Sequence, residues 1–313
     1  MNLLLALDMN TKNTLLKIHN EVFSKINKTY VDVFLCGAAS DSKFGSLRDG
    51  IRDAMKDYKY VRFLYPEDLF IDMLNMNKEH NLLTLEKFLA ENSDLICIVC
   101  ESPGSLVELG AFTNNDQTFD KVIAVIEEKR KKDKSFIMLG PVKLLEKRRK
   151  DKVIYYNEND LEKLYNHLLK AFRHSKKSDF TEKKVPKNNS VNTMMGLNNF
   201  IPLLLYFFKD MSVDQLTDYI KYVYMELGHS LHDFDTVFNS GLKLLYKEKH
   251  LNKYVKDNKS DDLNNKDSKE SFYSLTESGF NSTNSLLKNL NISNRTRFYD
   301  RIRFEIMENK FYT

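Results

Sequence analysis

A carboxylate, Glu108, follows an apolar run and a loop of small residues, an order that could place a nucleophile at a ligand crevice. Residues 95–100 read Leu-Ile-Cys-Ile-Val-Cys, a short and partly β-branched run typical of a strand buried on both faces of a parallel sheet. Pro103 and Gly104 end this run with turn residues. Ser105 is a suitable N-cap for a helix whose apolar residues recur at helical spacing. Doubly wound α/β folds bind ligands beyond the carboxyl ends of their strands, where this loop would lie.

Two interpretations of Glu108 follow from this spacing. Ser105-x-x-Glu108 matches a capping box, in which the Glu side chain reaches back to the backbone N–H of the N-cap residue. Alternatively, Glu108 is a carboxylate nucleophile at the ligand crevice, kept ionised by the helix N-terminus. The spacing by itself is compatible with both.

The longer string around Glu108 carries a family resemblance. Ser-Pro-Gly-Ser-x-x-Glu-Leu-Gly-Ala-Phe, residues 102–112, resembles the active-site segment of nucleoside deoxyribosyltransferase-like N-glycosidases. It is most similar to the branch found as effectors of retron anti-phage systems. Further anchors of the same resemblance are residues 33–37, 63–70, 135–141 and 301–307.

The resemblance implies a function and partners. The chain would be a toxin that hydrolyses the N-glycosidic bond of NAD and releases nicotinamide, with NAD as substrate and no cofactor or metal. It would associate with a retron reverse transcriptase and its msDNA, a branched RNA–DNA molecule, and act when released or activated from that complex. A homo-oligomer within the complex is left open.

Site residues also follow from the resemblance. In the family pattern, a Glu two positions ahead of a Gly attacks the anomeric carbon of the sugar, and Glu108 before Gly110 matches it. The family's second acid precedes the strand that leads to this motif. Glu86 has that position, so we expect it to hold ribose hydroxyls or to assist departure of the base. Many deoxyribosyltransferases carry Asp where this chain has Ser102, a difference that favours hydrolysis over transfer to a free base.

We expect six residues to contact the substrate: Gly37, Asp68, Ser102, Gly104, Ser105 and Asn115. Two of them have structural alternatives. Small residues after a first strand let a sugar or phosphate approach the backbone, yet they also form plain tight turns, so Gly37 fits either role. Asp68 also fits the first turn of a helix that begins near Pro66, where an acid complements the helix dipole.

Leaving-group chemistry favours NAD over neutral nucleosides. A neutral purine must be protonated to depart, and the motif contains no His; His80 is the nearest in the sequence. Nicotinamide in NAD is already cationic at the glycosidic nitrogen and can leave unprotonated. The alternatives are an N-glycosidase or (deoxy)ribosyltransferase acting on other nucleotides or nucleosides, and a catalytically silent, nucleotide-sensing DNA-binding regulator. A phosphoribohydrolase of nucleoside monophosphates is disfavoured because residues 102–105 lack its glycine-rich loop.

Composition indicates a two-domain protein of a reducing compartment. The 313 residues are 42% hydrophobic, and the net charge of +4 means that nucleic-acid affinity would require local clustering of Lys and Arg. Cys97-x-x-Cys100 on a strand would place its thiols on opposite faces, so we expect structural thiols, like Cys36. Residues 1–7 lack a basic signal-peptide start, and the apolar run 200–208 is too short to span a membrane. We therefore expect a cytoplasmic protein with no membrane partner.

The first half of the chain alternates strand-like and helix-like segments, which predicts a doubly wound parallel α/β sheet of the nucleoside deoxyribosyltransferase type. We place this domain at residues 1–173. The charge run 127–134 is expected to be a solvated loop. The expected helices are 11–28, 46–58, 82–92, one from Ser105 and 161–172, and the expected strands are 30–36, 60–64, 95–100, 121–126 and 153–156.

A polar, basic stretch at residues 174–193 predicts a linker to a mostly α, winged-helix-like domain at 194–313. Its helices are expected near 197–209, 213–227 and 232–249. Residues 252–270 are expected to form an extended flexible loop, the wing, followed by a short strand from Ser271.

Basic and aromatic residues gather in the third helix and the wing of this second domain. Lys243, Lys247, Lys253 and Lys256 lie close in sequence to Tyr246 and Tyr254. Such residues suit phosphate contact and base stacking, although exposed lysines can also merely solvate a surface. We expect these four lysines to bind nucleic acid.

Overall fold

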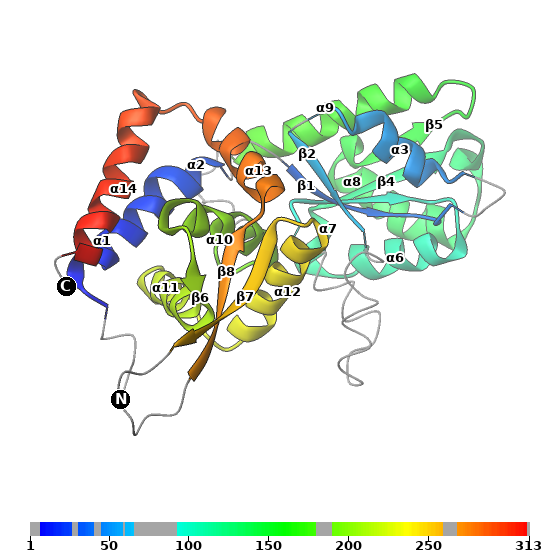
Figure 1. Cartoon of the computed structure of the whole chain (residues 1–313). Helices are drawn as coiled ribbons and strands as arrows, with labels where there is room; N and C mark the ends of the chain where they lie inside the picture. The colour runs from blue at the N-terminus through cyan, green and yellow to red at the C-terminus, as the bar shows by residue number, and fades with distance from the viewer. Residues whose placement is uncertain are drawn as a thin grey trace. The chain divides into compact units, whose positions relative to one another are not determined.

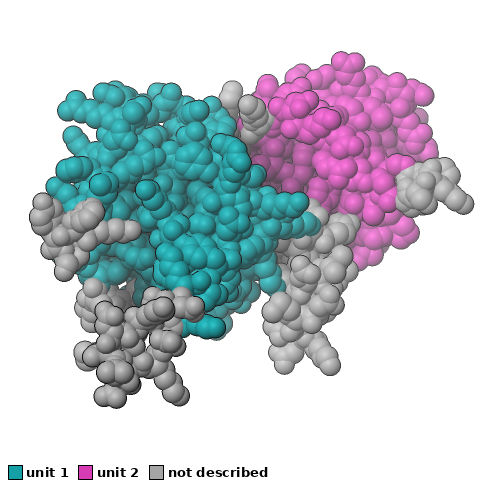
Figure 2. Space-filling view, in the orientation of Figure 1, with its two compact units in different colours: residues 1–28, 190–313 teal, residues 29–189 magenta. Residues whose placement is uncertain are grey.

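The structure is a computed structural model that describes residues 7–26, 31–40, 45–58, 60–65, 93–179, 190–258 and 268–311 (Figure 1). It divides into two compact units, one formed by residues 29–189 and the other by residues 1–28 together with 190–313 (Figure 2). The expected first domain, 1–173, differs from this division at its start, because the N-terminal helical segment belongs to the second unit.

A parallel five-stranded sheet forms the centre of the unit at residues 29–189. Its strands are β1 (Val31–Cys36), β2 (Val61–Leu64), β3 (Leu95–Val99), β4 (Val122–Glu127) and β5 (Val153–Tyr156), in the order β2-β1-β3-β4-β5. Every neighbouring pair is parallel, and Val33 of β1 is in register with both Phe63 and Leu95. The order reverses between β1 and β3, so the predicted doubly wound α/β sheet is confirmed.

Helices cover both faces of the sheet, which explains why β1 and β3 are buried along their whole length. One face packs against α3 (Leu47–Met55) and α9 (Leu161–Asp179), with Ile51 and Phe172 in the same apolar cluster as Val33 and Val99. The opposite face packs against α6 (Pro103–Thr113), where the Phe34 and Phe112 rings meet at 6.1 Å.

Shorter elements connect the strands on the β4 and β5 side. The charge run expected as a loop instead contains the end of β4 and a short exposed helical turn. The elements are α7 (Asp116–Phe119), η3 (Glu128–Lys132), η4 (Met138–Val142), α8 (Lys143–Arg148) and η5 (Lys150–Lys152).

The second unit has the helix–strand–helix–helix–strand–strand order of a winged helix, as predicted. The order runs α10 (Met194–Phe208), β6 (Met211–Ser212), α11 (Val213–Glu226), α12 (Phe234–Lys247), β7 (Leu251–Asn258) and β8 (Ser268–Leu275). Its antiparallel sheet has the order β6-β8-β7. The elements outside this core are α1 (Met9–Lys17), η2 (Ile18–Phe23), α2 (Ser24–Ile26), α13 (Glu277–Lys288) and α14 (Arg295–Phe311).

The expectation of a flexible loop at residues 252–270 is wrong for its two ends. Residues 252–258 and 268–270 belong to β7 and β8, which pair from Leu251–Leu275 to Asn258–Ser268, and residues 259–267 lie outside the described residues. Cross-strand side-chain pairs stabilise this hairpin, including the Tyr254 and Phe272 rings, stacked with centroids 5.9 Å apart. At the ends of the expected linker, 174–193, α9 runs to Asp179 and Ser190 belongs to the second unit.

Within the described ranges, no helix combines the length and the apolar character that crossing a bilayer requires.

Candidate functional site

Helix α6 begins three residues earlier than its sequence indicates. Its N-cap is Ser102, in an extended conformation, and Pro103 is the first helical residue. The Ser105 N–H donates to Ser102 Oγ at 3.2 Å, and the Ser102 N–H donates to Ser105 Oγ at 3.1 Å. The expectation that Ser105 is the N-cap is wrong, because Pro103 is favourable at the first helical position, where its missing N–H needs no partner.

This cap changes the interpretation of Glu108. Ser105 closes the capping box, so Glu108 lies in the second turn of α6, beyond reach of the N-cap. The capping-box interpretation of Glu108 is therefore wrong. The Ser102–Ser105 pair, and not Glu108, caps the N-terminus of α6.

Glu108 is half-buried, its Oε2 atom is buried, and it lies near the carboxyl end of β3. The Glu108 carboxylate affects the pKa of Cys100, the residue that follows β3. Burial raises the pKa of the Cys100 thiol to about 12; the Arg130 guanidinium opposes this rise, and the Glu108 and Glu101 carboxylates add to it. Three charged side chains thus gather around one buried thiol.

Glu101 braces the loop after β1 and the start of α3. Its Oε2 accepts the Leu47 N–H at 2.9 Å, and its Oε1 accepts the N–H groups of Ala38 at 3.2 Å and Arg48 at 3.3 Å. A carboxylate at a helix N-terminus satisfies donors that have no partner within the helix. Sequence reasoning did not assign Glu101 this role, because its partners lie more than 50 residues away in the chain and leave no local pattern.

Gly37 permits the close approach of these segments. A Cβ atom at this position would lie 3.0 Å from Arg48 Cβ, 3.1 Å from Glu101 Oε1 and 3.2 Å from Val99 Cβ. Contacts this short require neighbouring atoms to shift. Packing between β1, β3 and α3 therefore explains the glycine, and substrate contact at Gly37 stays a prediction.

A cleft of about 440 Å³ opens at the carboxyl ends of β3, β4 and β5. Glu101, Glu127 and Glu158 contribute carboxylates to it and Arg130 contributes a cation. Burial, and next the Glu127, Glu101 and Glu158 carboxylates, raise the pKa of Tyr156 in its wall to about 12. The lining residues are Gly45, Ser46, Leu47, Gly50, Cys100, Glu101, Glu127, Arg130, Tyr156, Glu158, Leu161 and Tyr165.

The carboxylates of this cleft could bind a polar or cationic ligand. Carboxylates accept hydrogen bonds from sugar hydroxyls, and they stabilise positive charge that develops on a sugar ring. Glu108 does not line the cleft. Cys100, whose pKa the Glu108 carboxylate helps to raise, does line it.

The remaining predicted site residues fall into separate places. Asn115 is the N-cap of α7, and its Oδ1 accepts the Gln117 N–H at 2.9 Å. Gly104 is exposed in the first turn of α6. Glu86 and Asp68 lie outside the described residues. The structure therefore brings Ser102, Gly104, Ser105 and Glu108 together at the start of α6.

The four predicted nucleic-acid-binding lysines lie on α12 and β7. Lys247, Lys253 and Lys256 are exposed, whereas Lys243 on α12 is half-buried. The Lys256 ammonium lies 4.4 Å from the centroid of Phe272, an aromatic residue of β8 that the sequence did not single out. Phe272 lies opposite Tyr254 across the two strands, a relationship that only the register of the hairpin reveals.

No group of three or more His, Cys, Asp or Glu residues suited to a metal ion occurs in the part of the chain that the structure describes. Cys36, Cys97 and Cys100 are free thiols, and all three are buried.

Comparison with known proteins identifies relatives of this chain. A family model described as STM3845 retron effector protein matches residues 45–253. A protein of Escherichia coli named "Retron Ec86 putative ribosyltransferase/DNA-binding protein" is 37% identical over 169 residues, 53% of this chain and 55% of that protein. The corresponding Ec73 protein of Escherichia coli is 36% identical over 118 residues, 36% of this chain and 37% of that protein. The matches thus span about half or less of each relative.

Proposed function

The chain belongs to the STM3845 retron effector family, and we propose that its α/β unit is an N-glycosidase that hydrolyses NAD and releases nicotinamide. In this proposal the protein is the toxin of a retron anti-phage system. Both Escherichia coli relatives are named as putative ribosyltransferases, a class of enzymes that break the same kind of bond to a ribose.

The observation that carries the proposal is the position of Glu108. It lies one helical turn beyond a cap that is complete without it, with one carboxylate oxygen buried, on the helix that follows β3, the strand at whose carboxyl end the acidic cleft opens. Ligands of doubly wound folds bind at this edge of the sheet. A half-buried carboxylate with no capping role is suited to nucleophilic chemistry.

The proposed reaction proceeds in two steps. The Glu108 carboxylate attacks C1′ of the nicotinamide ribose, the C1′–N bond breaks, and its electron pair leaves with the nicotinamide, which becomes neutral. Water then attacks C1′, regenerates the carboxylate and loses a proton to solvent, as in retaining glycosidases.

One feature supports NAD as the substrate, and a second supports hydrolysis over base exchange. Nicotinamide leaves without protonation, so a lone carboxylate suffices and no general acid is required. Many deoxyribosyltransferases carry Asp at the position of Ser102, which here is the N-cap of α6. The lack of that carboxylate favours water over a free base as the acceptor.

The second unit would hold the toxin to its partner. Its winged-helix order and its exposed Lys253 and Lys256 beside the stacked Tyr254 and Phe272 suit a nucleic-acid partner. The names of both relatives also include DNA-binding. In this proposal, the retron reverse transcriptase with its msDNA restrains the enzyme until infection.

The test is a substrate panel. The purified protein, with and without the cognate reverse transcriptase–msDNA complex, is incubated with NAD, NADP, nucleoside monophosphates and nucleosides, and the released bases are identified by chromatography. We expect nicotinamide from NAD, and expression without the partner should lower cellular NAD and arrest growth. Release of a different base, or growth arrest at constant NAD, would contradict the substrate assignment.

A further inference from the structure

The α/β unit has a further cavity, a pocket of about 590 Å³ between helix α3 and strand β2. Three cations line it, Arg48, Arg52 and Lys56, and among the described residues Asp49 is the sole carboxylate in its lining. The three cations are four residues apart, on one face of α3 and its C-cap, and together they span about 12 Å along the helix at about 1.5 Å per residue. The α3–β2 pocket therefore carries an excess of positive charge.

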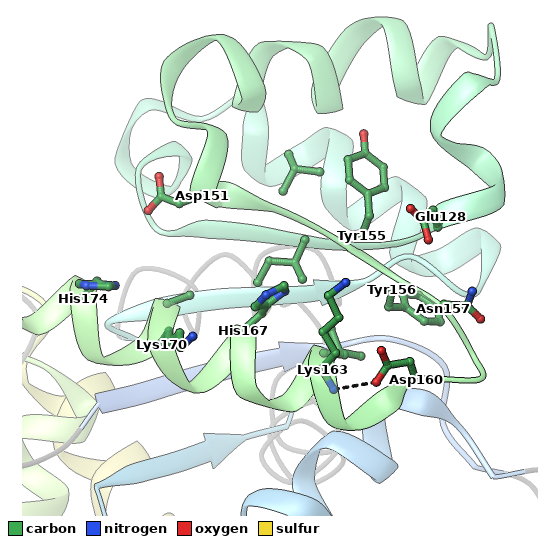
Figure 3. Close-up of a pocket in the computed structure, with 14 residues that line it drawn as sticks. Glu128, Asp151, Tyr155, Tyr156, Asn157, Asp160, Lys163, His167, Lys170 and His174 are labelled. Carbon is green, nitrogen blue, oxygen red and sulfur yellow. Dashed lines mark hydrogen bonds between the residues drawn. The ribbon is translucent and has the colours of Figure 1, made fainter.

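This excess distinguishes the α3–β2 pocket from another cavity of the same unit, a groove of about 500 Å³ between β5 and α9. Besides two histidines, the charged residues in the described lining of that groove are Glu128, Asp151, Asp160, Lys163 and Lys170 (Figure 3). Carboxylates outnumber lysines there, so the groove has no charge preference for an anion. The α3–β2 pocket does have one.

The single carboxylate, Asp49, is held against the loop that follows β1. Its Oδ2 accepts the Ser40 hydroxyl at 2.5 Å and the Ser40 N–H at 3.2 Å. Its Oδ1 lies 3.6 Å from Arg48 Nε and 3.7 Å from Arg52 Nη1. Burial raises the pKa of Asp49, but the Ser40 hydrogen bonds and the two guanidinium groups together bring it below its ordinary value. Asp49 is therefore ionised at neutral pH, and three cations less one carboxylate leave the described lining with two positive charges.

Tyr65 holds both guanidinium groups in place. The Cζ atoms of Arg48 and Arg52 lie over its ring, 5.0 and 5.6 Å from the centroid. Tyr65 and Arg48 are only 8% and 5% exposed, whereas Arg52 is exposed. A cation held over an aromatic ring has lost much of its conformational freedom before a ligand arrives, which lowers the entropic cost of binding. The pocket therefore presents two preorganised guanidinium groups to an anion.

The size and the lining of the pocket indicate more than a single inorganic anion. Cavities of about 300–1,000 Å³ hold small organic ligands. Met55, Val61 and Phe63 provide apolar surface beside the cations. Guanidinium groups bind phosphate oxygens through paired N–H donors, and an ammonium group binds them as a point charge. A ligand with more than one phosphate and an apolar part matches this combination.

The pocket adjoins the acidic cleft at the start of α3. Leu47 and Gly50 line the cleft, whereas Arg48 and Arg52 line the pocket. Glu101 of the cleft accepts the backbone N–H groups of Leu47 and Arg48, at 2.9 and 3.3 Å. The same helical turn is therefore part of both cavities.

We infer that the α3–β2 pocket binds the phosphate groups of a nucleotide. Arg48 and Arg52 would pair with the oxygens of one phosphate and Lys56 with those of the next, while the apolar wall contacts the nucleoside. Two sources supply such phosphates. One is the diphosphate of NAD, which rests on the proposed function, and the other is a separate nucleotide that binds independently of the reaction.

The test titrates the full chain with ADP, inorganic pyrophosphate and adenosine by isothermal titration calorimetry. The pocket variant is Arg52→Gln/Lys56→Gln, which changes two exposed side chains and leaves the buried Arg48 in place. Its control, Lys163→Gln/Lys170→Gln, removes the same charge from the β5–α9 groove. A third variant, Arg52→Lys/Lys56→Arg, keeps both charges in the pocket.

We expect ADP and pyrophosphate to bind the parent protein and the control, and adenosine, which has no phosphate, to bind far more weakly than ADP. The pocket variant should bind ADP at least about tenfold more weakly than the control, because it loses two charge-assisted contacts. Arg52→Lys/Lys56→Arg should recover most of that affinity. Equal ADP affinity in the pocket variant and the control would overturn the inference, and so would adenosine binding as tight as that of ADP.

A nicotinamide-release assay on the same variants distinguishes the two sources of phosphate. If the diphosphate of NAD occupies the pocket, the pocket variant should raise the KM for NAD and leave kcat nearly unchanged. If a separate nucleotide occupies it, the KM for NAD should equal that of the control while ADP binding is still weakened. A parent protein that binds ADP as expected but releases no nicotinamide would contradict the proposed function alone, because the titration does not depend on catalysis.

Discussion

Ser102 and Ser105 each accept the backbone N–H of the other at the start of helix α6, at 3.2 and 3.1 Å. This reciprocal pair satisfies the helix start and leaves Glu108 in the second turn. The stability of α6 and the proposed chemistry of Glu108 therefore depend on different side chains, and they can be perturbed separately.

Replacing Ser102 with Ala should destabilise the α/β unit. The variant loses the acceptor of the Ser105 N–H, and losing an N-cap side chain costs about 1 kcal/mol. Urea unfolding measures the change. Ser102→Asp, which retains a capping acceptor, should recover most of the lost stability, and equal stabilities for the Ala and Asp variants would show that the cap is unimportant.

Replacing Glu101 with Gln should loosen the start of α3. The amide keeps only one acceptor oxygen and no charge for the three N–H groups that the carboxylate holds. We expect a loss of about 1–2 kcal/mol, the range for hydrogen bonds to a charged group, and faster amide exchange at Leu47 and Arg48. Unchanged exchange at both amides would contradict the bracing role.

The wing should contribute to nucleic-acid binding through Lys253 and Lys256. Lys253→Gln/Lys256→Gln should weaken association with the nucleic-acid partner, with a slope against salt shallower by about 0.7–0.9 for each lost contact. Lys288→Gln, an exposed lysine at the end of α13, is the control for a change in net charge. Salt-independent association in the parent protein would mean that the wing binds protein instead.

Much of this structure was predictable from local patterns. Continuous apolar runs such as residues 95–100 identify the buried strands of a parallel sheet, and their alternation with helices gives the doubly wound fold. The start of α6 was misplaced because both Ser102 and Ser105 suit an N-cap, and the choice depends on Pro103. The strands of the β7–β8 hairpin are not evident from the charged sequence of the wing, because the Tyr254–Phe272 pairing exists only across the two strands.

Contacts between distant segments account for what the sequence could not reveal. Glu101 caps a helix that begins more than 50 residues before it. His19 of the N-terminal segment packs against Phe200 of α10, at 6.0 Å between ring centroids, which places this segment in the winged-helix unit. No periodicity within either segment encodes such a partner.

His19 should make the winged-helix unit sensitive to acid. Burial lowers the pKa of His19 below its ordinary value of 6.5, and a smaller contribution from His229 acts in the same direction. The unfolded chain then binds the proton more readily, so the stability is fully present above about pH 6.5 and is lost as the pH falls toward the folded-state pKa. Urea unfolding at about pH 7.5 and 5.5 should show this loss, and His19→Gln should reduce it. An identical pH dependence in the variant would contradict the assignment to His19.

The most direct test of the proposed chemistry compares Glu108→Gln with the parent protein in a melting curve and a nicotinamide-release assay on the same preparation. Gln has nearly the same shape, and Glu108 is not the cap of α6, so stability should change by no more than about 1 kcal/mol. An amide cannot carry the covalent sugar intermediate, so release of nicotinamide should fall by at least about a thousandfold. Association with the reverse transcriptase–msDNA complex should persist. Near-normal turnover in a stably folded Glu108→Gln variant would contradict the role of Glu108 as the nucleophile.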